Sequence, residues 1–257
     1  MQALLPAGVG LFAGSTAAYL AALWTSRPVV LRAAHVLLAL TVLLWVGILA
    51  GSVAHLAEGG VTRSYLGGSA IALSTLYLIL VRRYPISGLG SVVSALATLL
   101  SVFALFAQQQ NVTDPALVDW LLRVHIALAF IGVTAFAFST AVSLVYLAQA
   151  RMLKQKSKTE LRRRLPPLDV LDQLGMRGIV VGFPFYTVAL LLGSAQAIRT
   201  EHLRGSYVLA IISWVIYGVV LQARLTAGWR GRRAAILTVF GLVLALSVVA
   251  QYGFRSI

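Results

Sequence analysis

The sequence contains no cysteine, and charged residues are scarce. The absence of cysteine excludes disulfides, thiolate metal sites, iron–sulfur clusters, cysteine catalysis and covalent attachment of a c-type heme to this chain. Charged residues make up 11% of the 257 residues, whereas an ordinary soluble domain has about 25%. Hydrophobic residues make up 60%, which excludes an intrinsically disordered chain because such chains are poor in apolar residues.

Acidic residues are the rarest of the charged residues. Asp and Glu number 7 against 21 for Lys and Arg, so the formal net charge is +14. Two classes of protein are this basic: nucleic-acid binders, and polytopic membrane proteins that carry positive charges in their loops. The mean hydropathy of +0.90 favours the membrane protein, because a soluble domain of this size could not bury so much apolar surface. We therefore expect no nucleic-acid partner.

Long apolar runs divide the chain into membrane-spanning segments. The hydrocarbon core of a bilayer is about 30 Å thick, and a helix needs roughly 20 apolar residues to cross it. The sequence therefore predicts an all-α, polytopic integral membrane protein of about eight transmembrane helices, with residues 1–257 as a single transmembrane domain. The predicted spans are 4–25, 33–56, 65–81, 87–107, 119–149, 178–198, 206–223 and 234–254.

The distribution of Lys and Arg predicts the orientation of these spans. If the N-terminus is outside, 16 of the 21 basic residues lie on the inner side and 5 on the outer side. Positive residues accumulate in cytoplasmic loops, so we expect both termini on the outer side of a bacterial cytoplasmic (inner) membrane. No Lys or Arg precedes the first span, so we expect an uncleaved anchor rather than a signal peptide.

The longest break between spans is the basic loop 151–177, which is predicted to be cytoplasmic. It contains eight of the inner basic residues. Beyond Pro166 and Pro167, residues 168–174 alternate apolar and acidic residues, which predicts a short amphipathic helix that ends at Gly175. The loop suits a topology anchor, a binding surface for anionic lipid headgroups or a docking site for a protein, and the sequence leaves these three open.

The predicted orientation places the four histidines relative to the two sides of the membrane. His55, His125 and His202 lie toward the outer side, whereas His35 lies toward the inner half of the second span. Neutral imidazole is a common ligand of heme iron, so all four are candidate axial ligands, with His35 the last of them. His125 is the first candidate because it stands in an apolar helix, where an ionisable side chain is a functional candidate. The alternative is that each is an interfacial histidine with a satisfied hydrogen bond.

Small residues recur along one side of the fifth span. Such a row lets a flat ligand or a neighbouring helix approach closely, and ordinary helix packing is the alternative interpretation. The row follows His125 at helical spacing and consists of Ala129, Gly132, Ala135, Ser139 and Ser143.

Motifs for enzymatic chemistry are missing from the sequence. All seven carboxylates lie in loops or at the edges of spans, whereas a proton-coupled transporter usually has a buried one. No phosphate loop, nucleophile elbow or His-Glu-x-x-His zinc helix occurs. We therefore expect a protein that is not an enzyme and that holds no metal beyond heme iron.

Two stretches of the second half resemble a known family. Together they are similar to the cytochrome c assembly family of heme-handling membrane proteins, and more closely to its HemX-like, eight-span branch. The resemblance is strongest over residues 120–257 and covers the first four spans only in layout. The first stretch contains His125-Ile126, Leu165-Pro166-Pro167-Leu168-Asp169-Val170-Leu171-Asp172, Gly182-Phe183-Pro184-Phe185-Tyr186-Thr187 and Gly193. The second contains Trp214-Val215-Ile216-Tyr217 and Arg224-Leu225-Thr226-Ala227-Gly228-Trp229-Arg230-Gly231-Arg232-Arg233.

The resemblance implies that heme b binds near the outer face. His125 matches the family's external histidine at the start of a span. Residues 201–207 lack the Trp-Trp-Asp segment that holds heme in the family, and Gln222 replaces a histidine within the following span. Residues 251–257 also lack the expected C-terminal histidine. These departures predict that the chain is not a heme lyase.

Three functions therefore stay open. The leading hypothesis is a membrane protein that binds, handles or senses heme, as an accessory of cytochrome c maturation or heme biosynthesis and with proteins of those systems as partners. The second is a scaffold or regulator without heme, which docks a cytosolic partner through loop 151–177. The third is a small-molecule permease.

Overall fold

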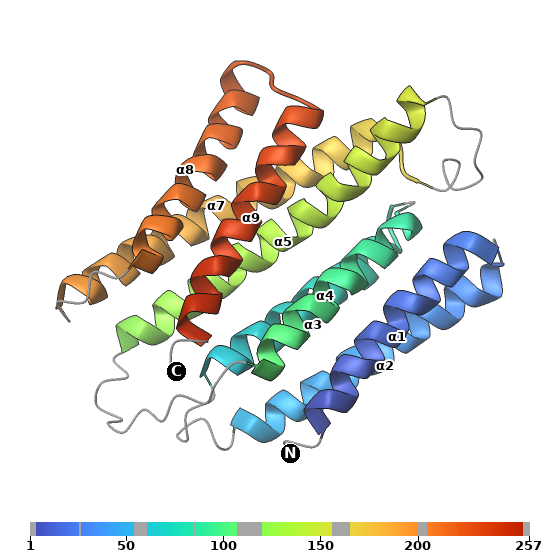
Figure 1. Cartoon of the computed structure of the whole chain (residues 1–257), viewed down its shortest axis with the longest axis horizontal. Helices are drawn as coiled ribbons and strands as arrows, with labels where there is room; N and C mark the ends of the chain where they lie inside the picture. Colours follow the sequence, from blue (N-terminus) through green and yellow to red (C-terminus); the bar gives the residue numbers. More distant parts are fainter. Residues whose placement is uncertain are drawn as a thin grey trace.

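The structure is a computed structural model, and it describes residues 4–25, 27–53, 61–84, 86–106, 120–155, 165–199 and 205–253. Within these ranges the chain is helical and contains no strand (Figure 1). In lipid a helix satisfies its own backbone hydrogen-bonding groups, so long apolar runs adopt this structure. The elements are α1 (Leu4–Thr25), α2 (Pro28–Val53), α3 (Val61–Leu80), the 3₁₀ helix η2 (Ser87–Leu89), α4 (Gly90–Phe106), α5 (Trp120–Lys154), α7 (Leu168–Arg199), α8 (Gly205–Thr226) and α9 (Arg232–Gly253).

The long helices of the described ranges coincide with the predicted spans. Six segments are long and apolar enough to cross a membrane, whereas the apolar part of α3, Leu66–Leu80, is shorter. The all-helical membrane class is therefore confirmed, while the count of eight spans and the outward termini stay predictions. The six segments are Leu5–Thr25, Pro28–Ala50, Ser87–Leu105, Val124–Lys154, Leu168–Ala195 and Tyr207–Thr226.

The prediction that a short helix ends at Gly175 is wrong. Helix α7 begins at Leu168, directly after the two prolines, and continues through Gly175 to Arg199. Glycine in a helix interior costs about 1 kcal/mol relative to alanine. Here α7 packs against α5 along this stretch, and the Ser139 hydroxyl donates to the Gly175 carbonyl oxygen at 2.7 Å, so tertiary contacts offset that cost. Helix α5 also runs on to Lys154, so both helices extend into the predicted loop 151–177.

The helices form two groups of four, which Figure 1 shows side by side. In the first group α1, α2, α3 and α4 pack in a closed ring, and in the second α5, α7, α8 and α9 do the same. Helix α5 joins the groups because it also contacts α3 and α4. At one end, Arg177 of α7 donates a hydrogen bond to the Tyr84 hydroxyl at 3.3 Å.

The core of the first group is built around Trp45, which is fully buried. A Cβ atom on Gly8 of α1 would lie 2.6 Å from the indole Nε1, and one on Gly67 of α3 would lie 2.6 Å from Cζ3. Both distances are shorter than any normal carbon contact. The two glycines therefore let α1 and α3 close on the indole of α2.

The row of small residues on α5 packs against α7. A Cβ atom on Gly132 would lie 3.1 Å from the backbone nitrogen of Tyr186, and one on Gly178 would lie 3.0 Å from the carbonyl oxygen of Ala135. Close backbone approach of this kind is how small residues join membrane helices. Ordinary helix packing is thus the interpretation that the structure supports for this row.

Candidate functional site

His125 lies in the second turn of α5, and its ring contacts α7. The ring Nδ1 lies 2.6 Å from the carbonyl oxygen of Ala189. A carbonyl oxygen only accepts hydrogen bonds, so Nδ1 donates and carries the ring hydrogen. The neutral ring then presents Nε2 as the nitrogen with a free lone pair. Among the described residues, Nε2 has no hydrogen-bond partner.

Gly193 makes room for this histidine one turn beyond Ala189. A Cβ atom at Gly193 would lie 2.7 Å from Cε1 and 3.1 Å from Nδ1 of His125. The same position is 3.4 Å from the hydroxyl oxygen of Tyr207, in the first turn of α8. Helices α5, α7 and α8 therefore come together around Gly193, beside the half-buried imidazole and at the end of the second group that is predicted to face outward.

The His125 arrangement fits one axial ligand of a heme. Histidines that bind metals almost always donate their other ring N–H to a carboxylate, carbonyl or water, which fixes the tautomer and the ring orientation. The contact with Ala189 fixes the ring in this way, with Nε2 as the nitrogen that carries the lone pair. Within the described ranges, no three or more His, Cys, Asp or Glu side chains gather into a metal site of their own.

His35 lies in a separate cluster in the first group. Its Nδ1 donates to the Leu31 carbonyl oxygen at 2.8 Å, and its Nε2 lies 3.4 Å from the Tyr77 hydroxyl oxygen. The ring stacks on Tyr77 with centroids 6.0 Å apart, and it meets Tyr19 edge-on at 5.4 Å. The contacts of His35 thus come from α1, α2 and α3, whereas the hydrogen bond of His125 is made with α7. The other two candidates, His55 and His202, lie outside the described residues.

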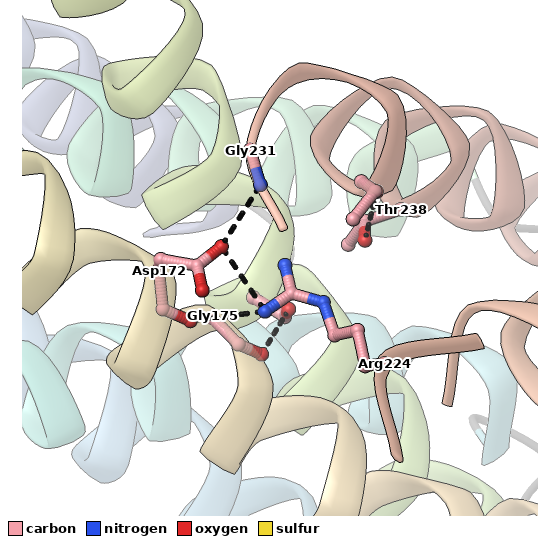
Figure 2. Close-up of polar contacts among 7 residues, drawn as sticks. Asp172, Gly175, Arg224, Gly231 and Thr238 are labelled. Carbon is pink, nitrogen blue, oxygen red and sulfur yellow. Dashed lines mark hydrogen bonds and ion pairs between the residues drawn. The ribbon is translucent and has the colours of Figure 1, made fainter. Parts of the chain in front are cut away.

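The two sequence stretches that resemble the family meet in space. Asp172 of α7 and Arg224 of α8 form an ion pair, with 3.2 Å between Oδ1 and Nη1, as Figure 2 shows. Nη1 also donates to the Asp172 carbonyl oxygen at 3.2 Å. The backbone N–H of Gly231 donates to the same Oδ1 at 3.3 Å. Only 6% of the Arg224 side chain and 17% of the Asp172 side chain are exposed, so the pair is largely buried.

The Gly231 backbone has a left-handed conformation that this contact requires. Its φ is +83°, which side chains other than glycine rarely adopt. A Cβ atom there would also lie 2.8 Å from the Tyr146 hydroxyl oxygen of α5. Nothing in the spacing of Asp172 and Arg224 along the sequence marks them as partners. Their shared presence in the family-like stretches, one acidic residue beside a strongly basic segment, is the signal that could have found the pair.

Comparison with known proteins gives matches over most of the chain. The family model described as "Cytochrome C assembly protein" matches residues 64–257, which begin in α3. The cytochrome c biogenesis protein CcsA of Chlamydomonas reinhardtii is 29% identical over 168 residues, which are 61% of this chain and 46% of that protein. CcsA of Mesostigma viride is 25% identical over 207 residues, 66% of each chain. CcsA of Heterosigma akashiwo is 37% identical over 116 residues, 42% of this chain and 34% of that protein.

The chain is similar to only part of these relatives. The matched region spans less than half of the Chlamydomonas protein. No solved structure matches the chain. The family model, in contrast, covers well over half of the chain and includes His125 together with both stretches that meet at Asp172. The chain therefore belongs to the cytochrome c assembly protein family.

Proposed function

We propose that this membrane protein binds heme b with His125 as one axial ligand, near the outer face of the bacterial cytoplasmic membrane. One observation carries the proposal: the Ala189 carbonyl oxygen takes the Nδ1 hydrogen of His125 at 2.6 Å and so leaves Nε2 for iron. Heme iron, when bound, supplies a coordination position that an imidazole nitrogen fills. Gly193 keeps the ring against α7, because any side chain there would collide with it. His55 and His202 are the candidates for a second ligand.

The role we propose is accessory heme binding, handling or sensing for cytochrome c maturation or heme biosynthesis, in the manner of the HemX-like branch. Membership of the cytochrome c assembly family supports the link to heme. The names of the relatives mention cytochrome c biogenesis, which supports a role in cytochrome c maturation. Residues 201–207 contain neither tryptophan nor aspartate, and this favours an accessory over a heme lyase.

A hemin titration of the purified protein tests the proposal. We expect a Soret band that saturates with added hemin in the wild type. His125→Ala should raise the apparent Kd for hemin about tenfold or more. Even the loss of a group that only hydrogen-bonds to a metal ligand weakens metal binding by about that factor. His35→Ala is the matched control, because it removes an imidazole from the other helix group, and it should leave the titration unchanged.

Two results would count against heme binding at His125. An equal loss in His35→Ala and His125→Ala would show that the titration reports general stability. A wild-type protein that takes up no hemin would overturn the proposal and leave the scaffold and the permease as the remaining functions.

A further inference from the structure

The connection between α8 and α9 carries an exposed basic cluster. We name it the arginine loop and define it as residues 228–233. Arg230, Arg232 and Arg233 are all exposed, and Trp229 is 36% exposed. Figure 1 shows this connection at one end of the molecule, as the link between the orange and red helices. Three guanidinium groups within four residues form a concentrated positive charge.

The arginine loop is held in a fixed conformation. Gly228 and Gly231 both have left-handed backbones, with φ of +62° and +83°. The backbone N–H of Trp229 donates to the Ala223 carbonyl oxygen at 3.0 Å, which folds the loop back onto α8. At the other side, the Gly231 N–H is bound to the Asp172 carboxylate. The loop is thus preorganised, and a ligand would not have to order it.

Among the described residues, neither carboxylate neutralises the arginine loop. Asp169 and Asp172 are the carboxylates of the described residues. Asp172 is paired with Arg224, and Asp169 is exposed in the first turn of α7. Among the described residues, the loop arginines make no ion pair with either carboxylate. The three arginines are exposed, and within the described part of the chain their guanidinium groups are not taken up by a carboxylate.

The surroundings of the arginine loop are apolar and face away from the protein. Leu225, in the last turn of α8, is 67% exposed, and Ile236, near the start of α9, is 45% exposed. In a membrane protein, exposed aliphatic side chains at such positions face lipid chains. Trp229 has the amphipathic ring that membrane proteins place at the level of the headgroups. The loop thus combines positive charge with an apolar flank, as suits the level where acyl chains and phosphate groups meet.

From this arrangement we infer that the arginine loop binds the phosphate headgroup of an anionic phospholipid, while Trp229, Leu225 and Ile236 contact its glycerol and acyl chains. Arg is suited to this role because its planar guanidinium makes two parallel hydrogen bonds to phosphate oxygens. The apolar flank favours a lipid over a free phosphate, which would gain nothing from those side chains. The inference does not depend on heme binding.

Native mass spectrometry of the detergent-solubilised full chain can test the site, with phosphatidylglycerol and phosphatidylcholine as probes. The wild type should retain phosphatidylglycerol in preference to phosphatidylcholine. The triple variant Arg230→Gln/Arg232→Gln/Arg233→Gln should raise the apparent Kd for phosphatidylglycerol about tenfold or more, because it removes all three positive charges that would bind the phosphate. The triple Lys variant at the same positions keeps the charge and should lose only about threefold.

The control removes the same charge from another part of the protein. Arg27, Arg82 and Arg83 are exposed arginines of the first helix group, on the side that is also predicted to be cytoplasmic. Their triple Gln variant should bind phosphatidylglycerol like the wild type. An equal loss in both triple Gln variants would overturn the site, since it would show attraction to total charge alone. If glycerol 3-phosphate displaces phosphatidylglycerol when both are at the same concentration, the site binds the phosphate alone, and the assignment to a lipid is wrong.

Discussion

Asp172 and Arg224 form a buried ion pair in which one carboxylate oxygen lies 3.2 Å from Nη1 and also accepts the backbone N–H of Gly231 at 3.3 Å. The residues are 52 positions apart in the sequence and belong to different helices. One side chain of α7 therefore binds both the last turn of α8 and the loop that leads to α9.

Asp172→Asn should destabilise the protein by about 3 kcal/mol, because it leaves the buried Arg224 without its counter-charge. Denaturation in mixed detergent micelles, followed by circular dichroism, measures the change. Asp169→Asn is the matched control, since it removes the same charge from an exposed position of the same helix and should change stability by less than about 0.5 kcal/mol. Equal effects of the two variants would contradict the importance of the pair.

Gly193→Ala should weaken hemin binding about tenfold, because its methyl group would occupy a position 2.7 Å from Cε1 of His125 and would displace the ring from Ala189. The hemin titration measures this change. Gly10→Ala is the control, since a Cβ atom there meets nothing within 4 Å. The double variant His125→Ala/Gly193→Ala should bind hemin no more weakly than His125→Ala alone. If the losses of affinity in the two single variants add up in the double variant, Gly193 does not act through His125.

Gly67→Ala should destabilise the first helix group by about 1–3 kcal/mol through overpacking against Trp45. Gly47→Ala, in α2, adds the same methyl group where no atom lies within 4 Å. It should be neutral or stabilising, because alanine favours the helix by up to about 1 kcal/mol. The two variants are compared by thermal denaturation in detergent, and the same shift in both would show that Trp45 is not tightly enclosed.

The predicted orientation can be read with single cysteines, because the chain has none of its own. Gln109→Cys, in a predicted outer loop, should react with a membrane-impermeant maleimide in intact spheroplasts. Ala227→Cys, which precedes the arginine loop and is exposed, should react only after the membrane is permeabilised. The reverse pattern would invert the topology. It would leave the lipid-binding inference intact, because a phospholipid leaflet faces either end.

The sequence predicts the long helices well because twenty-residue apolar runs are a strong and local signal. It fails at Gly175, where a residue that usually ends helices instead lies inside one. Helix α7 packs there against α5, where Ser139 donates to the Gly175 carbonyl oxygen from 36 residues away, and no local pattern in the sequence indicates such a contact.

The site is predicted in part, for a similar reason. His125 is identified from its apolar surroundings and from the family resemblance. The partner that fixes its tautomer is a backbone carbonyl of Ala189, which any residue could supply. Gly193 is among the residues that carry the resemblance, yet only the packing of α5 on α7 connects it with the imidazole.

The anchor at Asp172 also makes one end of the α8–α9 hairpin depend on a single side chain. The same carboxylate holds Arg224 in the last turn of α8 and the Gly231 backbone just before α9, so both arms share one attachment to α7 at this end. Farther along, α8 is held to α7 by other contacts, among them the hydrogen bond of 2.9 Å that the indole N–H of Trp214 donates to the Thr187 hydroxyl. Loss of Asp172 would therefore loosen both arms together at the connected end and leave the rest of the hairpin attached.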